Sequence, residues 1–333
     1  MISIICPIYN EEHYITQCID SILSQDYPKE NMEIIIVDGM STDNTRSIVK
    51  NYIEKYPFIF LIDNPEKVVP YAMNRGIQAS KGEIIIRLDA HAIYPKNYFS
   101  TLVKNLKNLK ADNVGAICRT LPAKNTSKCK AIAAALSTSF GMGNSHFRIG
   151  AKEVMQVDTV PFGCYRKDVF ERIGLYDNEL IRNQDDELNA RLIKNGGKIY
   201  LIPDIIIDYF ARDNIKKTAK MFYQYGLYKP LVNKKLGSPA TLRQFFPLLF
   251  VIGLIIGLPI CCIWRQLLPI YVGVICLYFL LACIFSLRSS LNIIQIIYQI
   301  TTYFTIHLSY GWGYLVGVYK ILFKKNFNVK VNR

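Results

Sequence analysis

The chain has 333 residues, of which 51% are hydrophobic and 20% are charged, and its formal net charge is +14. This composition excludes a disordered chain, and the length corresponds to about two domains. A basic total is typical of nucleic-acid-binding proteins, because Lys and Arg neutralise phosphates. Where the charge lies along the chain therefore decides whether that class applies.

The excess positive charge lies entirely in the last third of the chain. Residues 1–210 hold 25 basic and 25 acidic side chains, residues 211–240 hold seven basic and one acidic, and residues 241–333 hold eight basic and no acidic ones. The same last part is the most apolar. A basic and apolar segment without acids is typical of a membrane anchor. We therefore expect membrane lipids as a partner, and no nucleic acid.

Short apolar runs alternate with helical patterns over the first 90 residues. The predicted strands are 2–6, 32–37, 58–62 and 83–88, and the predicted helices cover 10–24, 41–55 and 68–80. This alternation predicts βαβ units and a mostly parallel, Rossmann-like α/β sheet. Ligands of such sheets bind beyond the carboxyl ends of the strands.

Polar residues follow three of these strands. They occupy residues 7–11, 38–43 and 89–91. A carboxylate in one such loop is as often a helix cap as a ligand, but three groups at one sheet edge indicate a binding site. Asp89 and His91 can share a divalent cation with a diphosphate, and carboxylate with imidazole suits Mn²⁺ or Mg²⁺. The alternative is that His91 is a partly buried turn residue.

Three consecutive carboxylates, Asp185, Asp186 and Glu187, precede a helical apolar pattern. They can stabilise the N-terminus of that helix, or one of them can accept a proton from an attacking hydroxyl. Upstream, Gly163 lies among aromatic residues where a sugar acceptor could pack, although an ordinary turn and strand is the favoured explanation of this segment.

Three stretches without charge follow residue 244. They cover residues 245–263, 267–287 and 289–319. Each is long enough to cross a hydrocarbon core of about 30 Å, and the alternative is a set of buried core helices. The short spacer at 264–266 makes the first two a helical hairpin. Three spans would place the basic residues after 323 opposite residues 1–240, against the positive-inside tendency. Two spans with an interfacial or re-entrant third stretch would keep these basic residues on the side of residues 1–240. We therefore expect two to three spans.

The N-terminal residues lack the pattern of a cleavable signal peptide. We therefore expect a multi-pass protein of the cell (cytoplasmic) membrane whose first 210 residues are cytoplasmic. The predicted division of the chain is 1–210, a basic amphipathic interfacial segment at 211–243, a transmembrane region at 244–323 and a basic tail at 324–333.

Taken together, the motifs resemble glycosyltransferase family 2, which has the GT-A fold. The matching segments are 7–11, 37–43, 74–76 with 81–83, 87–91 and 184–188, in the order of the family. The Asp-x-His form and the apolar tail are similar to the branch of the succinoglycan-biosynthesis glucosyltransferase. Three positions depart from the family pattern: Gly39 stands where a second Asp is common, His91 replaces an Asp, and Gln184 replaces a Glu.

The resemblance implies an inverting transfer of a sugar from a nucleotide-diphosphate sugar, with a UDP-sugar as the expected donor. The expected acceptor is a hydroxyl of a lipid-linked saccharide in cell-surface polysaccharide synthesis. Asp185 is then the catalytic base, and Asp89 and His91 hold the divalent cation. The residues expected at the nucleotide sugar are Pro7, Tyr9, Glu11, Asp38, Arg75 and Asp89, and those expected at the acceptor are Gly163, Asp186, Glu187 and Gln224.

Residues 211–243 interleave basic and aromatic side chains, which favours a segment at the membrane surface near a lipid-diphosphate acceptor. The alternative is a solvated linker. Processive synthases of the family carry a Gln-x-x-Arg-Trp motif here, whereas Gln224 is followed by no Arg-Trp pair, so we expect one sugar per acceptor.

Three alternative functions make different demands on the sequence. A polyprenyl-phosphate glycosyltransferase would use a lipid phosphate as acceptor and would not need Asp185. A nucleotidyltransferase would need a Gly-rich loop, which residues 7–11 do not provide. A non-enzymatic membrane scaffold would show no dependence on a divalent cation.

Overall fold

The structure is a computed structural model that describes residues 1–90, 92–289 and 292–327. Its contacts divide the chain into two compact units. The first unit holds Met1–Arg119 and Gly150–Tyr209, and the second holds 120–149 and the described residues from Phe210 onwards. Residues 120–149, which the sequence-based division places with the first 210 residues, thus belong by their contacts to the second unit.

The first unit is built on a mixed sheet, and its first four strands are parallel, as expected. These strands are β1 (Ile2–Ile8), β2 (Met32–Asp38), β3 (Ile59–Asp63) and β4 (Ile84–Arg87), in the spatial order β3-β2-β1-β4. Beyond β4 the sheet continues in the order β8-β6-β9-β5, with β7 on β9. The antiparallel part comprises β5 (Ala92–Ile93), β6 (Asn113–Leu121), β7 (Met155–Gln156), β8 (Cys164–Arg166) and β9 (Ile199–Phe210).

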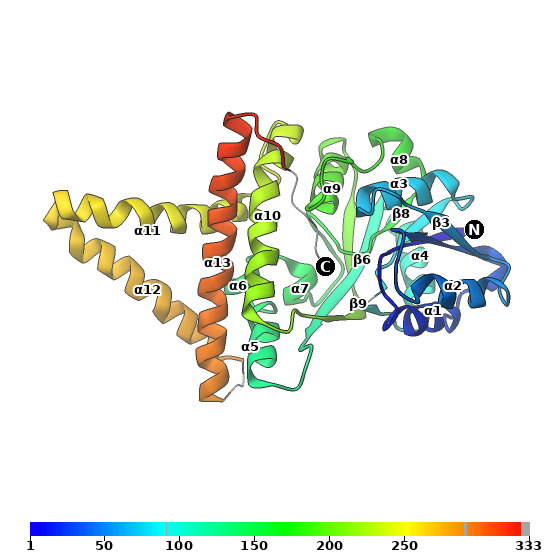
Figure 1. Cartoon of the computed structure of the whole chain (residues 1–333), viewed down its shortest axis with the longest axis horizontal. Helices are drawn as coiled ribbons and strands as arrows, with labels where there is room; N and C mark the ends of the chain where they lie inside the picture. The colour runs from blue at the N-terminus through cyan, green and yellow to red at the C-terminus, as the bar shows by residue number, and fades with distance from the viewer. Residues whose placement is uncertain (91, 290–291, 328–333) are drawn as a thin grey trace. The chain divides into compact units, whose positions relative to one another are not determined.

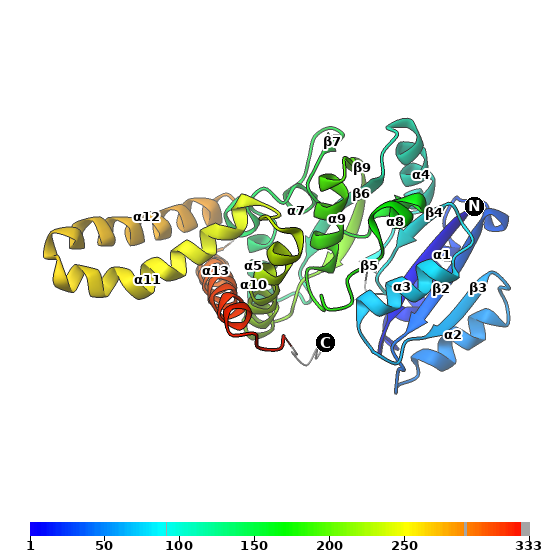
Figure 2. The same cartoon turned by 90° about the horizontal axis from the view of Figure 1, so that it is seen from above.

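Helices cover this sheet (Figures 1 and 2). They are α1 (Ile15–Leu23), α2 (Thr45–Ile53), α3 (Val69–Ala79), α4 (Tyr98–Asn108), α8 (Asp168–Ile173) and α9 (Gln184–Lys194), with a 3-10 turn at Lys29–Asn31. Apolar residues three and four apart bury one face of α1, which explains why the sequence pattern predicted it. Gly76 lets α3 lie directly on Ile5 of β1, because a Cβ there would approach Ile5 to 2.5 Å.

The second unit is helical in its described residues. Its elements are α5 (Ser127–Ala135), α6 (Ser139–Met142), α7 (His146–Ile149), α10 (Ile215–Leu236), α11 (Phe245–Ile263), α12 (Leu268–Leu287) and α13 (Ile293–Leu322), with 3-10 turns at Leu242–Gln244 and Arg265–Leu267. Two segments of these described residues, Leu242–Ile263 and Arg265–Leu287, are long and apolar enough to cross a membrane. The third uncharged stretch forms α13.

Glycine residues bring α10 and α13 into backbone contact. An added Cβ at Gly313 would overlap the carbonyl oxygen of Tyr223, and one at Gly226 would overlap that of Tyr310. Small residues allow two helices to approach this closely. The two helices lie side by side in both views (Figures 1 and 2).

We expect Gly313→Ala to destabilise the second unit by about 1–3 kcal/mol, the usual effect of overpacking. Gly253→Ala on α11 is the matched control, since nothing lies within 4 Å of a Cβ at that position and Ala is favoured in helices. Thermal unfolding of the full chain in detergent measures both. Equal melting of the Gly313→Ala variant and the parent protein would contradict the packing.

Candidate functional site

The loops that follow β1 and β2 bind each other through main-chain groups. Asn10, at φ 53°, donates its N–H to Ser41 Oγ at 2.8 Å and accepts the N–H of Thr42 on Oδ1 at 2.8 Å. Glu11 N–H donates to Thr45 Oγ1 at 2.8 Å. Asn tolerates the left-handed conformation better than most residues. Hydrogen bonds therefore join the two predicted donor-binding loops at the carboxyl edge of the sheet.

Asp38 holds the second of these loops in place. Its side chain is fully buried, and its carboxylate accepts Ser41 N–H at 3.0 Å and Ser41 Oγ–H at 2.5 Å. Arg46 donates to Asp38 at 2.6 Å and to Asp63 at 2.8 Å. Asp38 thus fixes the loop in place, and direct contact between Asp38 and a nucleotide stays a prediction. Sequence reasoning missed Arg46, although it lies on the helix that immediately follows this loop.

Three other predicted donor residues come from the same edge. Pro7 lies inside β1, opposite Val37 of β2, and Glu11 is buried. Tyr9 is half-buried, and the ammonium of Lys67 lies 5.7 Å from the centre of its ring. An added Cβ at Gly39 would approach Tyr9 to 3.2 Å. An Asp at position 39 would therefore require Tyr9 to shift, which gives a physical reason for the departure from the family pattern.

Arg75 and Asn74 lie on α3 and face different partners. The guanidinium of Arg75 donates to both oxygens of Glu66 at 2.8 Å. The Asn74 amide donates to Tyr176 O and accepts Tyr176 N–H, each at 2.9 Å. Asn74 thereby fixes the loop after α8, which is a structural role that the sequence motif did not specify.

Arg87 connects the most important predicted residues. It ends β4, its side chain is buried, and its guanidinium forms an ion pair with Asp185, 98 residues away. The same guanidinium lies 3.4 Å from Asp89. Arg87 N–H also donates to Gly163 O at 3.1 Å. The structure thus brings Asp89 and Asp185 together around the buried guanidinium of Arg87, a residue for which the sequence suggested no role.

Asp185 lies in the first turn of α9, after Asn183 at φ 59°. Its side chain is 30% exposed, so it is open to a ligand. Burial raises the pKa of Asp185 above its ordinary value, although the charge of Arg87 acts in the opposite direction. A carboxylate with a raised pKa is a better proton acceptor than an ordinary one.

Asp89 is held in place through its main chain. Its N–H donates to the hydroxyl of Tyr94 at 2.8 Å, and that hydroxyl donates to Asp89 O at 3.1 Å. The Asp89 side chain is 20% exposed. His91 lies outside the described residues. Those residues contain no cluster of three or more His, Cys, Asp or Glu side chains that could hold a metal ion.

The predicted acceptor residues occupy four different environments. Gly163 is buried, and an added Cβ would approach Asn113 and Tyr165 to 2.5 Å. Asp186 is half-buried beside Asp185. The carboxylate of Glu187 binds Arg191 at 2.7 and 2.9 Å, and Arg191 in turn donates to main-chain carbonyls at the end of α8. Gln224 is buried on α10 of the second unit.

Comparison with known protein families matches residues 3–174 to glycosyl transferase family 2. A curated relative from Methanococcus voltae is the dolichyl N-acetyl-α-D-glucosaminyl phosphate 3-β-D-2,3-diacetamido-2,3-dideoxy-β-D-glucuronosyltransferase. It is 34% identical over 308 residues, which cover 86% of this chain and 94% of that protein. The succinoglycan biosynthesis protein ExoA of Rhizobium meliloti is 29% identical over 247 residues, or 74% of each chain.

Two solved structures share the fold at low sequence identity. The mannosyltransferase PcManGT from Pyrobaculum calidifontis, in complex with GDP-Man and Mn²⁺, has a TM-score of 0.60 at 18% identity and covers 93% of this chain and 87% of its own. S. aureus TarS 1–349, in complex with UDP-GlcNAc, has a TM-score of 0.55 at 17% identity and covers 94% of this chain and 92% of its own.

Proposed function

We propose that this chain, which belongs to glycosyl transferase family 2 and is a glycosyltransferase with the GT-A fold, transfers a sugar with inversion from a UDP-sugar to a hydroxyl of a lipid-linked saccharide. The product is part of a cell-surface polysaccharide. One observation carries the proposal: a buried arginine, Arg87, holds the partly exposed carboxylates of Asp89 and Asp185 together at the carboxyl end of β4.

The reaction is a single displacement. Asp185 accepts the proton of the acceptor hydroxyl while the hydroxyl oxygen bonds to the anomeric carbon. The bond between that carbon and the diphosphate oxygen breaks, and the nucleoside diphosphate leaves with the bonding electrons. One base is sufficient, because the diphosphate leaves without being protonated. Arg87 orients Asp185, and the two loops, residues 9–11 and 39–45, bind the nucleotide.

We propose that the Asp89 carboxylate takes part in binding a divalent cation. Mg²⁺ is usually held by one or two carboxylates together with substrate phosphates rather than by a full protein cage. The partly exposed carboxylate of Asp89 fits that role, and His91 joins it by its place in the sequence. When bound, the cation neutralises charge on the leaving diphosphate.

The relatives support a lipid-linked saccharide as the acceptor. The Methanococcus voltae relative acts, by its name, on dolichyl N-acetyl-α-D-glucosaminyl phosphate, and ExoA belongs to succinoglycan biosynthesis. A polyprenyl phosphate is the alternative acceptor, but it is already ionised and needs no base. The position of Asp185 beside Arg87 and Asp89 therefore favours a hydroxyl acceptor.

The apolar helices support a membrane location. The segments 242–263 and 265–287 are only 11% and 6% buried over their most apolar windows. Side chains as exposed as Phe246, at 74%, and Ile270, at 64%, would face water if no lipid covered them. We propose that α11 and α12 form a membrane-spanning hairpin and that the first unit lies on the cytoplasmic side.

Release of nucleotide from a panel of sugar donors tests the proposed function. Membranes that contain the full chain receive Mn²⁺, a lipid extract and one donor at a time, including UDP-GlcNAc, UDP-glucose and GDP-mannose. We expect UDP release from one UDP-sugar, dependent on both the cation and the lipid extract. Release of GDP alone would contradict the UDP assignment, and no release from any donor would contradict the function.

A further inference from the structure

The longest helix, α13, has an exposed face without charge. The exposed apolar side chains on it are Ile293, Ile294, Ile297, Leu308, Trp312, Tyr319 and Leu322. Most of their spacings are multiples of a helical turn, so they form one continuous stripe. Thr301 and Thr305 complete the stripe, and their hydroxyls donate to carbonyls one turn earlier at 2.8 Å. The hydroxyls of these two threonines are therefore satisfied within the helix.

We propose that α13 lies along the surface of the lipid bilayer rather than across it, with this stripe in the boundary between head groups and acyl chains. The inference rests on the proposed membrane hairpin of α11 and α12. Interfacial segments combine an apolar face with a basic face, which α13 and the attached, lysine-rich α10 supply together.

The opposite face of α13 is packed against a helix that is rich in lysine. Gly313 and Gly317 contact the α10 backbone at Tyr223 and Leu227. The 22-residue helix α10 contains six lysines, of which Lys216, Lys217, Lys220, Lys234 and Lys235 are exposed. If α13 crossed the membrane, α10 would be carried in beside it. Neither α10 nor α13 is among the described segments that are long and apolar enough to cross a membrane, and Lys side chains are costly to bring into a bilayer. This contact therefore makes a transmembrane α13 unfavourable.

The length of α13 differs from that of the hairpin helices. Its 30 residues extend over about 45 Å at 1.5 Å per residue, whereas the hydrocarbon core is about 30 Å thick. The 19 residues of α11 and the 20 residues of α12 correspond to about 28 and 30 Å. The hairpin helices thus match the core, and α13 does not.

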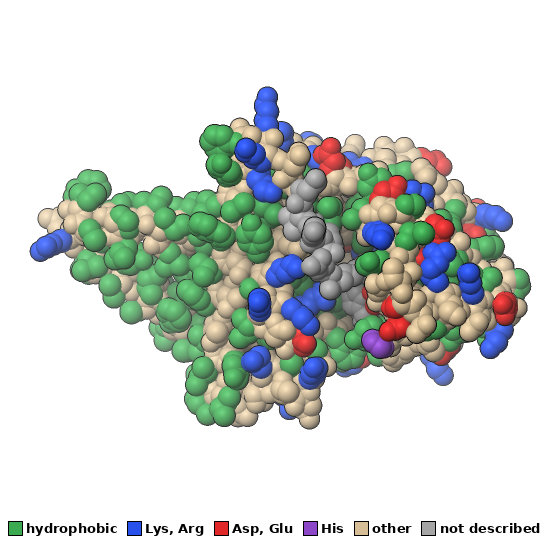
Figure 3. Space-filling model, in the orientation of Figure 1, with side chains coloured by type: hydrophobic (Ala, Val, Ile, Leu, Met, Phe, Trp, Pro, Cys, Tyr) green, Lys and Arg blue, Asp and Glu red, His purple; other side chains and the backbone are tan. Residues whose placement is uncertain are grey.

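The crossing of α11 with α13 places the hairpin at an angle to α13. An added Cβ at Gly311 would overlap Pro247 O and approach Val251 to 2.5 Å, so the first turns of α11 pack on α13. Figures 1 and 2 show α11 and α12 leading away from α13 rather than running along it. Hydrophobic side chains cover the hairpin in Figure 3, whereas Lys and Arg gather over the region of α10.

An in-plane α13 settles the topology of the chain. Of the described helices only α11 and α12 then cross, so the described residues before α11 and residues 324–327 after α13 lie on the same side of the membrane. Exposed Lys324 and Lys325 follow α13 directly, where anionic head groups attract them. This arrangement satisfies the positive-inside tendency, which three spans would not.

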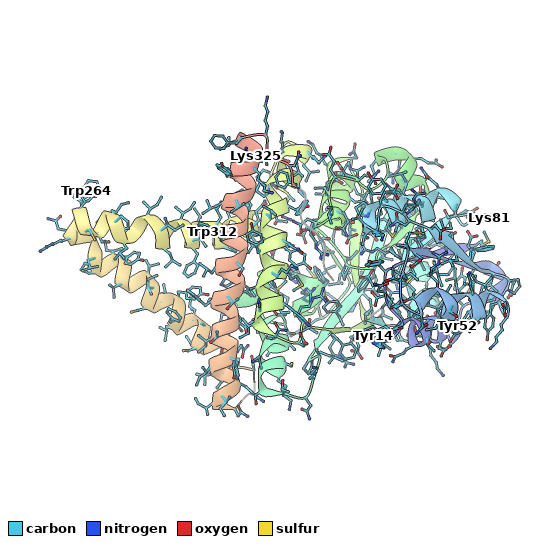
Figure 4. The ribbon with its side chains drawn as sticks, in the orientation of Figure 1. Tyr14, Tyr52, Lys81, Trp264, Trp312 and Lys325 are labelled. Carbon is cyan, nitrogen blue, oxygen red and sulfur yellow. The ribbon has the colours of Figure 1, made fainter. Side chains whose placement is uncertain are left out.

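Single-tryptophan variants report on α13 and on the hairpin separately. Figure 4 shows Trp264 at the far end of the hairpin and Trp312 on α13. The full chain is reconstituted in vesicles of phosphatidylcholine with a minority of phosphatidylglycerol. The acyl chains are brominated either near the head group or near the methyl end. The Trp264→Phe variant leaves Trp312 as the only tryptophan. A Phe279→Trp variant with both native tryptophans replaced by Phe is the control for the bilayer centre, because Phe279 lies near the middle of α12.

We expect bromine near the head group to quench Trp312 most strongly, and bromine near the methyl end to quench the introduced tryptophan of the Phe279→Trp control most strongly. Strong quenching of Trp312 by the deep bromines would mean that α13 spans the membrane and would overturn the inference. An unquenched Trp312 beside a quenched control would mean that protein covers the stripe, which also overturns it. If neither fluorophore is quenched, the hairpin is not inserted, and the membrane part of the proposed function fails as well.

Discussion

Replacing Asp185 by Asn is expected to lower sugar transfer by about 100-fold to 10,000-fold, the usual contribution of a general base. Asn keeps the shape of the side chain but cannot accept the proton of the acceptor hydroxyl. Donor binding should remain nearly unchanged, because the loops after β1 and β2 that we propose to bind the nucleotide use other residues. Transfer to a lipid extract measures the first effect, and the dissociation constant of the donor measures the second.

Glu171→Gln is the control for loss of a carboxylate, since Glu171 is exposed on α8. It should retain full activity. If Asp185→Asn also retains transfer, Asp185 is not the base, and an acceptor that is already ionised, such as a lipid phosphate, becomes the better assignment. If the variant loses donor binding in parallel with transfer, Asp185 belongs to the donor site instead.

Replacing Arg87 by Gln is expected to lower kcat by about 100-fold, the effect of misplacing a catalytic group by about 1 Å. Arg87 is buried between two carboxylates, and Gln leaves Asp89 and Asp185 without the cation that holds them. Because the charge of Arg87 lowers the pKa of Asp185, its loss raises that pKa further. More of the base is then protonated at a given pH, so the acid limb of the pH–rate profile should move to higher pH.

The pH profile distinguishes this role from a purely structural one. Arg87→Lys keeps the charge without the two-pronged geometry, so it should restore the acid limb and only part of kcat. Arg166→Gln removes an exposed arginine that pairs with Asp168 at 3.0 Å, and it should leave both quantities unchanged. Thermal unfolding of each variant checks that the fold is retained. A Gln variant that is slow but has an unshifted acid limb would show that Arg87 does not act on Asp185.

Much of the first unit could be predicted because its signals are local. The apolar runs at 2–6, 32–37, 58–62 and 83–88 became β1 to β4, with ends that differ by two residues or fewer. Burial on both faces of a parallel strand requires a continuous apolar run, so the pattern is readable without knowing its neighbours. The helix expected from residue 10 begins at Ile15, because residues 10–12 bind the loop after β2 instead.

Motifs and periodicity are local properties of the chain, so the family, the glycosyltransferase activity and the sheet edge with the polar loops could be predicted from the amino acids alone. Which groups meet in space depends on the folded chain. Arg87 and Asp185 are 98 residues apart, and no periodicity links them. Likewise, an uncharged stretch of about 30 residues fits both a spanning and an interfacial helix. The contact of α13 with the lysine-rich α10 is the observation on which the proposed interfacial placement rests, because the environment of a helix depends on what is packed against it.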